Sequence, residues 1–568
     1  MVRRWQLIPH HPDAEQALCR ELGIPPLLAH LLAVRGLTTP GAAQAFLDAR
    51  LSAHLRSPML FRQMPAAAAR VIEALRRGER IGIYGDYDVD GISGSAILVR
   101  FFRALGHDPA VYIPHRLRDG YGVTAPGVRR LASDGTRLMI TVDCGAVSHA
   151  EIALAATLGM DAIVCDHHQV SGTPLPARAV LNPIEADAGF PFSGLCGAGV
   201  AFYLALGVRQ RLREGGETAL PDVRRYLDLV TLGTIADIVP LVEENRVLVK
   251  HGLRELLQTQ SRGLMALKAV SGVSAVSAGV VGFRLAPRIN AGGRLAEAAR
   301  AVELLVTDDA ARAQALAAEL DQENRTRQTI EQDILADALH RVDRQVDFAD
   351  RRSIVLASRD WHAGVIGIVA SRLVDRFYRP TVLLAVNGDT GLARGSGRSI
   401  WGLNLHEAFA ACRHTLEGFG GHRMAAGLSI RETQIPAFSE LFETAVRAAT
   451  RPQDFVPETR IDAELRLAAI DARLLTDLER LAPHGPGNPE PIFLARRVRV
   501  VSRRTVGEHH LKLAVRDAER TLSAIGFRMA GAAVDEGAWL DILFSPEFNE
   551  WNGNRTLQLR LRDFRQAG

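Results

Sequence analysis

Cysteine and long apolar runs are both scarce in this chain of 568 residues. The five cysteines are scattered and include no CxxC pair, which argues against a disulfide framework and against a thiolate zinc cluster. No apolar run approaches the ~20 residues that span a membrane, and the first residues lack the apolar centre of a signal peptide. We therefore expect a cytoplasmic protein with no membrane segment.

Lysine is also rare, since only three of the 68 basic residues are lysine and the rest are arginine. A GC-rich genome explains most of this bias, but the planar guanidinium also binds phosphate in bidentate fashion. The net charge of +4 permits a nucleic-acid partner without requiring one. Apolar residues make up 47% of the chain, which is ordinary for a globular protein, and the length predicts roughly three or four domains.

Residues 67–240 alternate between short apolar runs and helical segments, which predicts a parallel sheet covered on both faces. The expected strands are 81–84, 111–113, 138–142, 162–165 and 179–181, and the expected helices between or before them are 67–77, 93–105 and 150–158. In such sheets the functional groups lie beyond the carboxyl ends of the strands.

A helix with no proline or glycine is predicted from Thr307 to Arg344, and its length of ~57 Å fits a strut between domains. A second, smaller αβ region follows to about residue 450. The last hundred or so residues then show alternating segments separated by turns, which predict about five antiparallel strands. A small β-barrel fits this count, and the OB-fold is a common barrel of this size that binds single strands.

Three aspartates at alternate positions, Asp86, Asp88 and Asp90, directly follow the first apolar run. Carboxylates this close repel one another unless a cation lies between them. Asp143, the tripeptide 166–168 (Asp-His-His) and Asp237 also follow apolar runs, although one such residue alone is more often a helix cap or turn former. If four strand ends meet at one sheet edge, carboxylates and imidazoles together suit two Mn²⁺ or Mg²⁺ ions, which can hold a phosphate and activate water.

Several motifs, in order, resemble the DHH phosphoesterase superfamily, and within it the RecJ family of bacterial single-strand-specific DNA exonucleases. The first are GDYDVDG at 85–91, VDCG at 142–145, DHH at 166–168 and ADIVPL at 236–241. The others are DGYG at 119–122, CGAGVAF at 196–202, PRINAGGR at 287–294, WHAGVIGIVASRL at 361–373, GSGRSI at 395–400, FGGHRMAAGL at 419–428 and HGPGNPEPIF at 484–493.

The resemblance implies a DHH catalytic domain at 67–295, a connecting helix at 296–346, a DHH-associated substrate domain at 347–450 and an OB-fold at 456–568. Residues 1–66 carry little information, and we expect a helical segment that caps the catalytic domain.

The resemblance also implies a set of metal ligands and catalytic residues. Two Mn²⁺ or Mg²⁺ ions are expected on Asp86, Asp88, Asp90, Asp143, His167 and Asp237, with Asp143 as the bridge and Asp86 as an occasional ligand. His168 and Asp143 are the expected catalytic residues. One position departs from the pattern: many superfamily members have a histidine four residues before Asp88, where this chain has Tyr84, so one ion would have fewer protein ligands.

The expected substrate-binding residues lie in the glycine-rich and arginine-bearing motifs, where they would be more than solvated surface charges. They are Arg116, Arg288, Asn290, Arg294, Ser396, Arg398, Gly421 and His422, and Ser396 and Arg398 suit a 5′ phosphate. Five arginines from Arg496 to Arg504 fit either a nucleic-acid-binding face or a charged edge strand. Trp361 and His362 fit packing as well as they fit strand contact.

The resulting expectation is a metal-dependent 5′→3′ exonuclease of single-stranded DNA in repair and recombination. We expect a monomer, with a single-strand-binding protein and a helicase as candidate partners. A phosphodiesterase of short oligonucleotides or cyclic dinucleotides is the first alternative, and a binding module that has lost its metal site is the second. The barrel argues against the first, and the full set of acids and imidazoles argues against the second.

Overall fold

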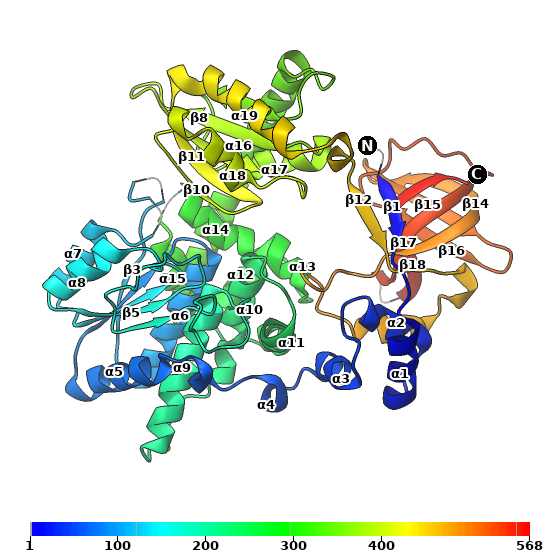
Figure 1. Cartoon of the computed structure of the whole chain (residues 1–568). Helices are drawn as coiled ribbons and strands as arrows, with labels where there is room; N and C mark the ends of the chain where they lie inside the picture. Colours follow the sequence, from blue (N-terminus) through cyan, green and yellow to red (C-terminus); the bar gives the residue numbers. More distant parts are fainter. Residues whose placement is uncertain (1–2, 117, 121, 296, 552–553, 568) are drawn as a thin grey trace.

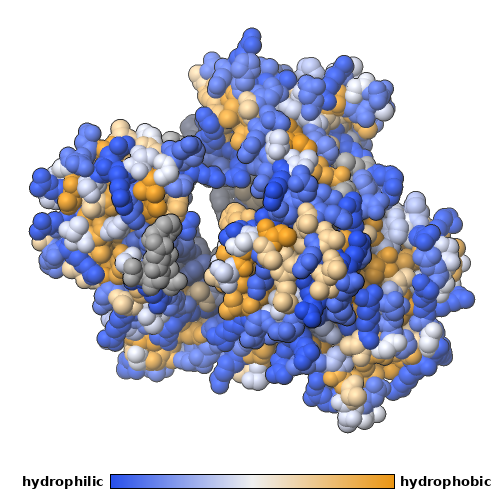
Figure 2. Space-filling model, turned by 180° about the vertical axis from the view of Figure 1, so that it is seen from behind, coloured by the Kyte–Doolittle hydropathy of each residue, from blue (hydrophilic) through white to orange (hydrophobic). Residues whose placement is uncertain are grey.

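The computed structural model describes residues 3–116, 118–120, 122–295, 297–551 and 554–567. No helix within these ranges is long and apolar enough to cross a membrane. The chain forms a large α/β domain, a smaller α/β domain and a C-terminal barrel (Figure 1). In the view from behind, the three parts surround a central opening, whose rim carries both hydrophilic and hydrophobic residues (Figure 2). The predicted fold class is confirmed.

The large domain is built on a five-stranded parallel sheet of order β3-β2-β4-β5-β6. Its strands are β2 (Ile81–Gly85), β3 (Ala110–Tyr112), β4 (Leu138–Val142), β5 (Asp161–Cys165) and β6 (Ala179–Leu181). Gly85, Val142 and Cys165 are in register across the three central strands. The residues that follow them therefore leave the sheet at the same edge.

Helices cover both faces of this sheet, and alternate strand residues enter two separate hydrophobic clusters. One face packs against α5 (Met64–Arg77), α6 (Val89–Ala104), α9 (Gly197–Glu214) and α10 (Leu227–Ala236), and the other against α7 (Ala125–Ser133) and α8 (His149–Thr157). Beyond α10 the domain continues with α11 (Glu243–Leu257), α12 (Arg262–Val270), α13 (Ala278–Val280), the π-helix η3 (Val281–Leu285), α14 (Ala286–Leu295) and α15 (Ala299–Val306).

The predicted long helix is α16 (Ala310–Gln345), which has 36 residues and leads into the smaller domain. That domain has a mixed five-stranded sheet of order β10-β11-β9-β8-β7. The strands are β7 (Ile354–Ser358), β8 (Thr381–Val386), β9 (Leu392–Arg398), β10 (Gly418–Gly421) and β11 (Ala425–Arg431). One face packs against α16 and α17 (Ile366–Phe377), and the other against α18 (Leu405–Ala411) and α19 (Ile435–Ala449).

The C-terminal part is a closed barrel whose strand order is β14-β15-β16-β18-β17, with β17 pairing back to β14. The strands are β14 (Phe493–Val506), β15 (His510–Arg516), β16 (Thr521–Gly526), β17 (Trp539–Trp551) and β18 (Asn554–Gln566); β12 (Glu458–Ile461), β13 (Ala463–Glu464) and α20 (Ala472–Glu479) precede them. The prediction of purely antiparallel strands is wrong at one place, because β16 and β18 are parallel. A crossover of this kind leaves no trace in the alternation of single strands.

The N-terminal segment lies on the barrel, so the prediction that it caps the catalytic domain is wrong for its first helices. It consists of β1 (Arg4–Leu7), α1 (Pro12–Leu22), α2 (Pro26–Ala33), α3 (Pro40–Asp48), α4 (Leu51–His54) and η1 (Pro58–Leu60). β1 pairs with β12 (Figure 1). The apolar faces of α1 to α3 share a hydrophobic cluster with the barrel. Helix α4 and η1 pack against helices of the large domain, and α3 contacts α11 of that domain through Phe46.

A buried arginine on α11 joins these parts. Arg246 is 1% exposed and donates to the backbone carbonyls of Phe46, Arg480 and Leu481, at 2.7–3.0 Å. Its guanidinium lies 3.5 Å from the centre of the Phe46 ring. The catalytic domain, the N-terminal segment and the chain that leads into the barrel therefore meet at one side chain.

Candidate active site at the carboxyl edge of the parallel sheet

The three alternating aspartates occupy the turn between β2 and α6, but they have different roles there. Asp86 follows β2 and is buried. Asp88 is the N-cap of α6 and accepts from the amides of Asp90 and Gly91 at 2.9 and 3.3 Å. Asp90 lies in the first turn of α6, where a carboxylate is favoured by the helix dipole. The capping geometry thus holds all three carboxylates at the sheet edge.

The tripeptide 166–168 is ordered by its aspartate. Asp166 accepts from the amide of Ala146 at 2.8 Å, from the amides of His167 and His168, and from Nδ1 of His168 at 2.8 Å. Burial alone would raise the pKa of Asp166, but the His168 and Ala146 hydrogen bonds hold it below its usual value. Sequence reasoning gave Asp166 no role. The structure shows that it orients His168 and fixes which ring nitrogen carries a proton.

His167 points into the centre of the carboxylate group. Its Nε2 lies 3.1 Å from Asp143, 3.5 Å from Asp237 and 3.8 Å from Asp90. Asp143 has a φ of 64°, a backbone conformation that residues other than glycine rarely adopt. Such local strain clusters at functional sites.

Asp237 lies in the same cluster, but a helix and not a strand positions it. It is the C-cap of α10 and does not follow a strand, so the prediction of a fourth strand end is wrong. The apolar run before it is a buried helix, because a short apolar run has no periodicity that separates the two.

The predicted metal ligands form two groups of closely spaced donor atoms, and a third group, Asp143, His167 and His168, connects them. Asp86, Asp88 and Asp143 make one group, Asp90, His167 and Asp237 make another, and within each group the ligand atoms lie within 4.8 Å of one another. Oδ1 of Asp86, Oδ1 of Asp143 and Nε2 of His167 are buried without a hydrogen-bond partner. Buried polar atoms are normally satisfied, so these orphaned atoms fit divalent cations well.

The pKa values of the clustered carboxyl groups also indicate that the site lacks positive charge. Burial, and then the neighbouring Asp88, raise the pKa of Asp86 well above its usual value. Burial and the carboxylates around it do the same to the pKa of Asp143, and they raise the pKa of Asp237 to about 9. Carboxylates packed this closely are stable in ionised form only with cations between them.

The CGAG motif at the start of α9 packs against Asp90 and donates hydrogen bonds to it, a role that sequence reasoning did not assign. The amides of Gly197 and Ala198 at the start of α9 donate to Asp90 at 2.6 and 2.9 Å. A Cβ at Gly197 would lie 2.5 Å from Cβ of Asp143. Glycine is therefore needed for the helix to approach both aspartates, and the run of small residues at the helix start is the signal that could have indicated this.

Tyr84 occupies the position where many superfamily members have a histidine. It is completely buried, and its hydroxyl lies 3.1 Å from Oγ1 of Thr124 and accepts from the Thr124 amide at 3.0 Å. Its ring belongs to the hydrophobic cluster on the α7 side of the sheet. The DGYG motif nearby includes Tyr121, which lies outside the described residues.

A second set of predicted residues gathers where the smaller domain faces the catalytic domain. Burial, and then the charges of Arg116 and Arg398, lower the pKa of Arg294 to about 9. Arg398 donates to Oγ of Ser396 at 3.0 Å. Gly367, at the start of α17, lies against both side chains, since a Cβ there would be 2.7 Å from the Ser396 hydroxyl and 2.9 Å from Arg398.

His422 of the smaller domain faces His168 of the large domain. The rings of His168 and His422 stack with centroids 6.1 Å apart. Gly421 has a φ of 132°, and a Cβ there would lie 2.6 Å from the carbonyl of Ala425, so the turn that presents His422 requires glycine.

Three other singled-out residues are used within the fold. Arg288 forms an ion pair with Asp321 of α16 at 2.8 Å, and Asn290 accepts from the amide of Val89 at 3.2 Å. Their contact with substrate stays a prediction. Trp361 is 6% exposed and donates to Asp337 at 2.8 Å, which is a packing role.

The parallel sheet, the acid and imidazole cluster at its edge, and the facing domain define a DHH-type metal-dependent phosphoesterase. Matching families are the DHH family, N-terminal domain, at residues 80–234, the DHHA1 domain at 351–448 and the RecJ OB domain at 461–563. The chain belongs to the RecJ family of single-stranded-DNA-specific exonucleases.

Two curated relatives and one solved structure illustrate this. The chain is 36% identical to single-stranded-DNA-specific exonuclease RecJ of Salmonella typhimurium, over 97% of this chain and 98% of the relative. It is 37% identical to the Bacillus subtilis protein of the same name, over 99% of this chain and 70% of the relative. The crystal structure of RecJ in complex with Mn²⁺ from Thermus thermophilus has a TM-score of 0.85 and 34% identity, covering 100% of this chain and 80% of that one.

Proposed function

We propose that this chain is a metal-dependent exonuclease that degrades single-stranded DNA in the 5′→3′ direction. The observation that carries the proposal is the cluster of Asp86, Asp88, Asp90, Asp143, His167 and Asp237, with its orphaned buried atoms, in a chain of the RecJ family. A binding module that had lost its metal site would have no reason to retain this costly set of buried acids.

The two groups of ligands would each hold one divalent cation, with Asp143 and His167 between them, 3.1 Å apart. When bound, Mn²⁺ or Mg²⁺ would neutralise the scissile phosphate and increase the acidity of the attacking water. The protein's own contribution is position: the α6 cap fixes Asp88, the α9 amides fix Asp90, and Asp166 fixes His168. His168 and His422 then approach the scissile phosphate from opposite domains.

Selection of the 5′ end is assigned to the group around Ser396 and Arg398. A hydroxyl and a guanidinium at the start of α17, with Arg116 and Arg294 close by, combine fixed positive charge with the positive end of a helix dipole. Burial and then the charge of Arg116 also lower the pKa of Arg398, and like charges gathered in this way favour an anion between them. A terminal 5′ phosphate is the anion that the substrate supplies.

The C-terminal barrel would bind the part of the DNA strand that lies beyond the active site. β14 pairs with β15 on one side and with β17 on the other, so its arginines do not guard an edge strand. Val498 and Val500 are buried whereas Arg499 is exposed, and Arg503 and Arg504 follow on the outer surface, with Lys512 opposite Arg504 on β15. A cationic face of this kind suits the phosphate backbone of a single strand.

The test is digestion of a long single strand labelled at one end or the other, with Mn²⁺, Mg²⁺ or EDTA. Loss of the 5′ label first, metal dependence and an intact duplex control are the expected results. Faster cleavage of dinucleotides or cyclic dinucleotides than of long strands would favour the alternative phosphodiesterase. Loss of the 3′ label first would contradict the assigned polarity while leaving the metal site intact.

We also propose that the protein acts in the cytoplasm, as a monomer, in DNA repair and recombination. A single strand to digest has to be exposed, so a helicase and a single-strand-binding protein are the matching partners. Sedimentation of the purified chain, and cleavage of a forked duplex with and without a helicase, test these points.

A further inference from the structure

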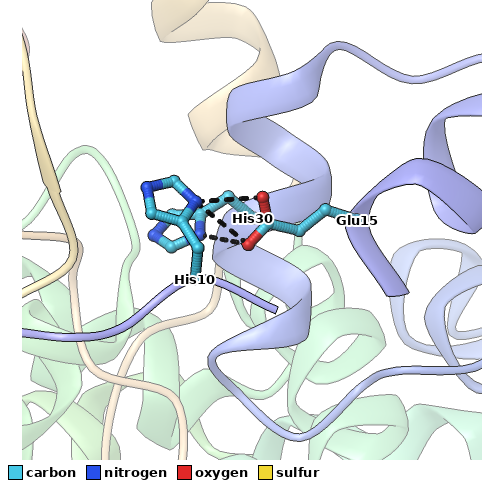
Figure 3. Close-up of side chains that lie close together, drawn as sticks. All are labelled: His10, Glu15 and His30. Atoms are coloured by element: carbon cyan, nitrogen blue, oxygen red, sulfur yellow. Dashed lines mark hydrogen bonds and ion pairs between the residues drawn. The ribbon is translucent and has the colours of Figure 1, made fainter. Parts of the chain in front are cut away.

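Among the described residues, one group of closely spaced histidine and carboxylate ligands lies outside the active site. It consists of His10, Glu15 and His30, which come from the loop before α1, from α1 and from α2. Nδ1 of His10 lies 3.0 and 3.2 Å from the two oxygens of Glu15, and Nδ1 of His30 lies 2.7 Å from Oε1 (Figure 3). The His10 side chain is 64% exposed, that of Glu15 17% and that of His30 3%.

His30 has an acceptor at each ring nitrogen. Its Nε2 lies 2.6 Å from the backbone carbonyl of Asp462, and its Nδ1 faces Glu15. A carbonyl and a carboxylate only accept hydrogen bonds, and a neutral imidazole has a single N–H. The second ring nitrogen of His30 therefore needs a proton or a metal ion between it and its acceptor. If Nε2 donates to Asp462, Nδ1 offers its lone pair toward Glu15. A backbone carbonyl that fixes the tautomer in this way is typical of metal-bound histidines.

Glu15 is held ready as an anionic ligand. Burial alone would raise its pKa, but the contacts with His30 and His10 and the hydrogen bond from the His11 amide lower the pKa of Glu15 to about 2. A bound cation would take the place of the ring protons in the two histidine contacts. The carboxylate is therefore ionised throughout the physiological range.

We propose that His10, Glu15 and His30 bind one divalent transition-metal ion, and that zinc fits best. Two imidazoles and one carboxylate, without thiolate, suit zinc better than Mg²⁺, which prefers oxygen. Zn–N and Zn–O bonds of about 2.0–2.1 Å place neighbouring ligand atoms roughly 3.3 Å apart. The distances of 2.7–3.2 Å between the two Nδ1 atoms and the Glu15 oxygens are close to this spacing. A water on the solvent side, beside the exposed His10, completes four ligands.

The ion would fasten the N-terminal segment to the barrel. His30 touches the backbone at Asp462, between β12 and β13, while β1 pairs with β12 on the same side. Because binding stabilises only the folded arrangement, zinc raises the stability of this junction without touching the catalytic centre.

The experiment uses the full-length chain, stripped with EDTA and then dialysed against Zn²⁺. Bound zinc is counted by elemental analysis, and Tm is measured with and without zinc, for the parent, His10→Gln, Glu15→Gln and Asp143→Asn. His11→Gln is the matched control, since the neighbouring His11 contributes only its amide. His10→Gln alters an exposed side chain, so this variant is expected to fold even if Glu15→Gln does not.

His10→Gln should bind one zinc fewer than the parent and lose the zinc-dependent rise in Tm, while retaining nuclease activity with Mn²⁺. Asp143→Asn should still bind zinc at the N-terminal site, and His11→Gln should behave as the parent. Equal zinc content and equal Tm response in the parent and in His10→Gln would overturn the proposal, and would mean that a proton alone holds the three side chains together.

Discussion

The carboxyl edge of the catalytic sheet and the N-terminal segment are organised in opposite ways. At the sheet edge, short motifs carry their ligands on adjacent residues, and the strand register brings distant motifs together. In the N-terminal segment no residue pattern indicates which part of the chain it packs against. Helices α1 to α3 pack on a barrel that begins more than 400 residues later. Local spacing therefore encodes the chemistry, whereas long-range burial encodes the placement of the parts.

The two regions also balance charge differently. The active site gathers carboxylates with an excess of negative charge, which ions from solution can neutralise. The junction around α11 buries the cation of Arg246 on three neutral carbonyls, and burial followed by the charge of Arg35 lowers the pKa of Arg246 to about 9. The carboxylate cluster serves to bind metal ions, and the Arg246 junction serves to hold the parts of the fold together. Substitutions can therefore change activity and stability separately.

The largest expected effect is that of Asp143→Asn on cleavage. Loss of the carboxylate between the two ligand groups should lower the cleavage rate by about 10³-fold or more, a loss typical of removing a central catalytic group. Single-strand binding, measured by fluorescence anisotropy, should change little. Asp333→Asn, an exposed position on α16, is the control. Cleavage at the parental rate by Asp143→Asn would disprove the site assignment.

Arg246→Met should instead reduce stability with the active site intact. Three backbone carbonyls would lose the guanidinium donor, and Phe46 would lose the cation over its ring, which should cost about 3–5 kcal/mol in the free energy of unfolding. Urea unfolding measures the loss, and limited proteolysis should release the barrel earlier. Arg254→Met changes an exposed arginine of the same helix and should be neutral. Equal stability of the two variants would show that α11 does not hold the parts together.

Arg398→Ala should act on end recognition rather than on chemistry. We expect the preference for a 5′-phosphorylated over a 5′-hydroxyl strand to fall about 10- to 100-fold, as loss of one charge-assisted contact predicts. Paired digestions of the two substrates give the ratio. Arg394→Ala, which removes an exposed arginine of the same strand, serves as the matched variant. An unchanged ratio would remove Arg398 from the proposed phosphate site.

The smallest effect concerns pH and the motif at 484–493. Burial, opposed by Glu490, lowers the pKa of His484 to about 4 from the usual 6.5. The neutral ring is favoured in the folded state, so its stability contribution is complete above pH 6.5 and is lost as the pH falls toward 4. His484→Gln should flatten the dependence of Tm on pH in that window, whereas His414→Gln, at an exposed position, should not. Parallel pH profiles for His484→Gln and the parent would contradict this.

Much of the site was predictable because its geometry is local. Asp86, Asp143 and the tripeptide at 166 each follow a strand, so the rule that parallel strands end together was sufficient to group them. Asp237 was grouped correctly for a wrong reason, since it ends a buried helix. Sequence reasoning missed the support from the α9 amides, although the small residues at the start of α9 are a signal for it. It also missed the orienting role of Asp166, because the fold and not residue identity decides which side chains form a hydrogen bond.

The sequence by itself determined the alternation of strands and helices, the long helix, the barrel segments and the identity of the candidate ligands, because periodicity and turn chemistry act over a few residues. Only the tertiary structure decided that β16 and β18 run parallel, that α1 to α3 pack on the barrel, and that His10, Glu15 and His30 meet. These contacts join segments far apart in the chain, and the apolar pattern of each segment is compatible with packing against many others. The arrangement observed is the one that gives the lowest free energy for the whole chain.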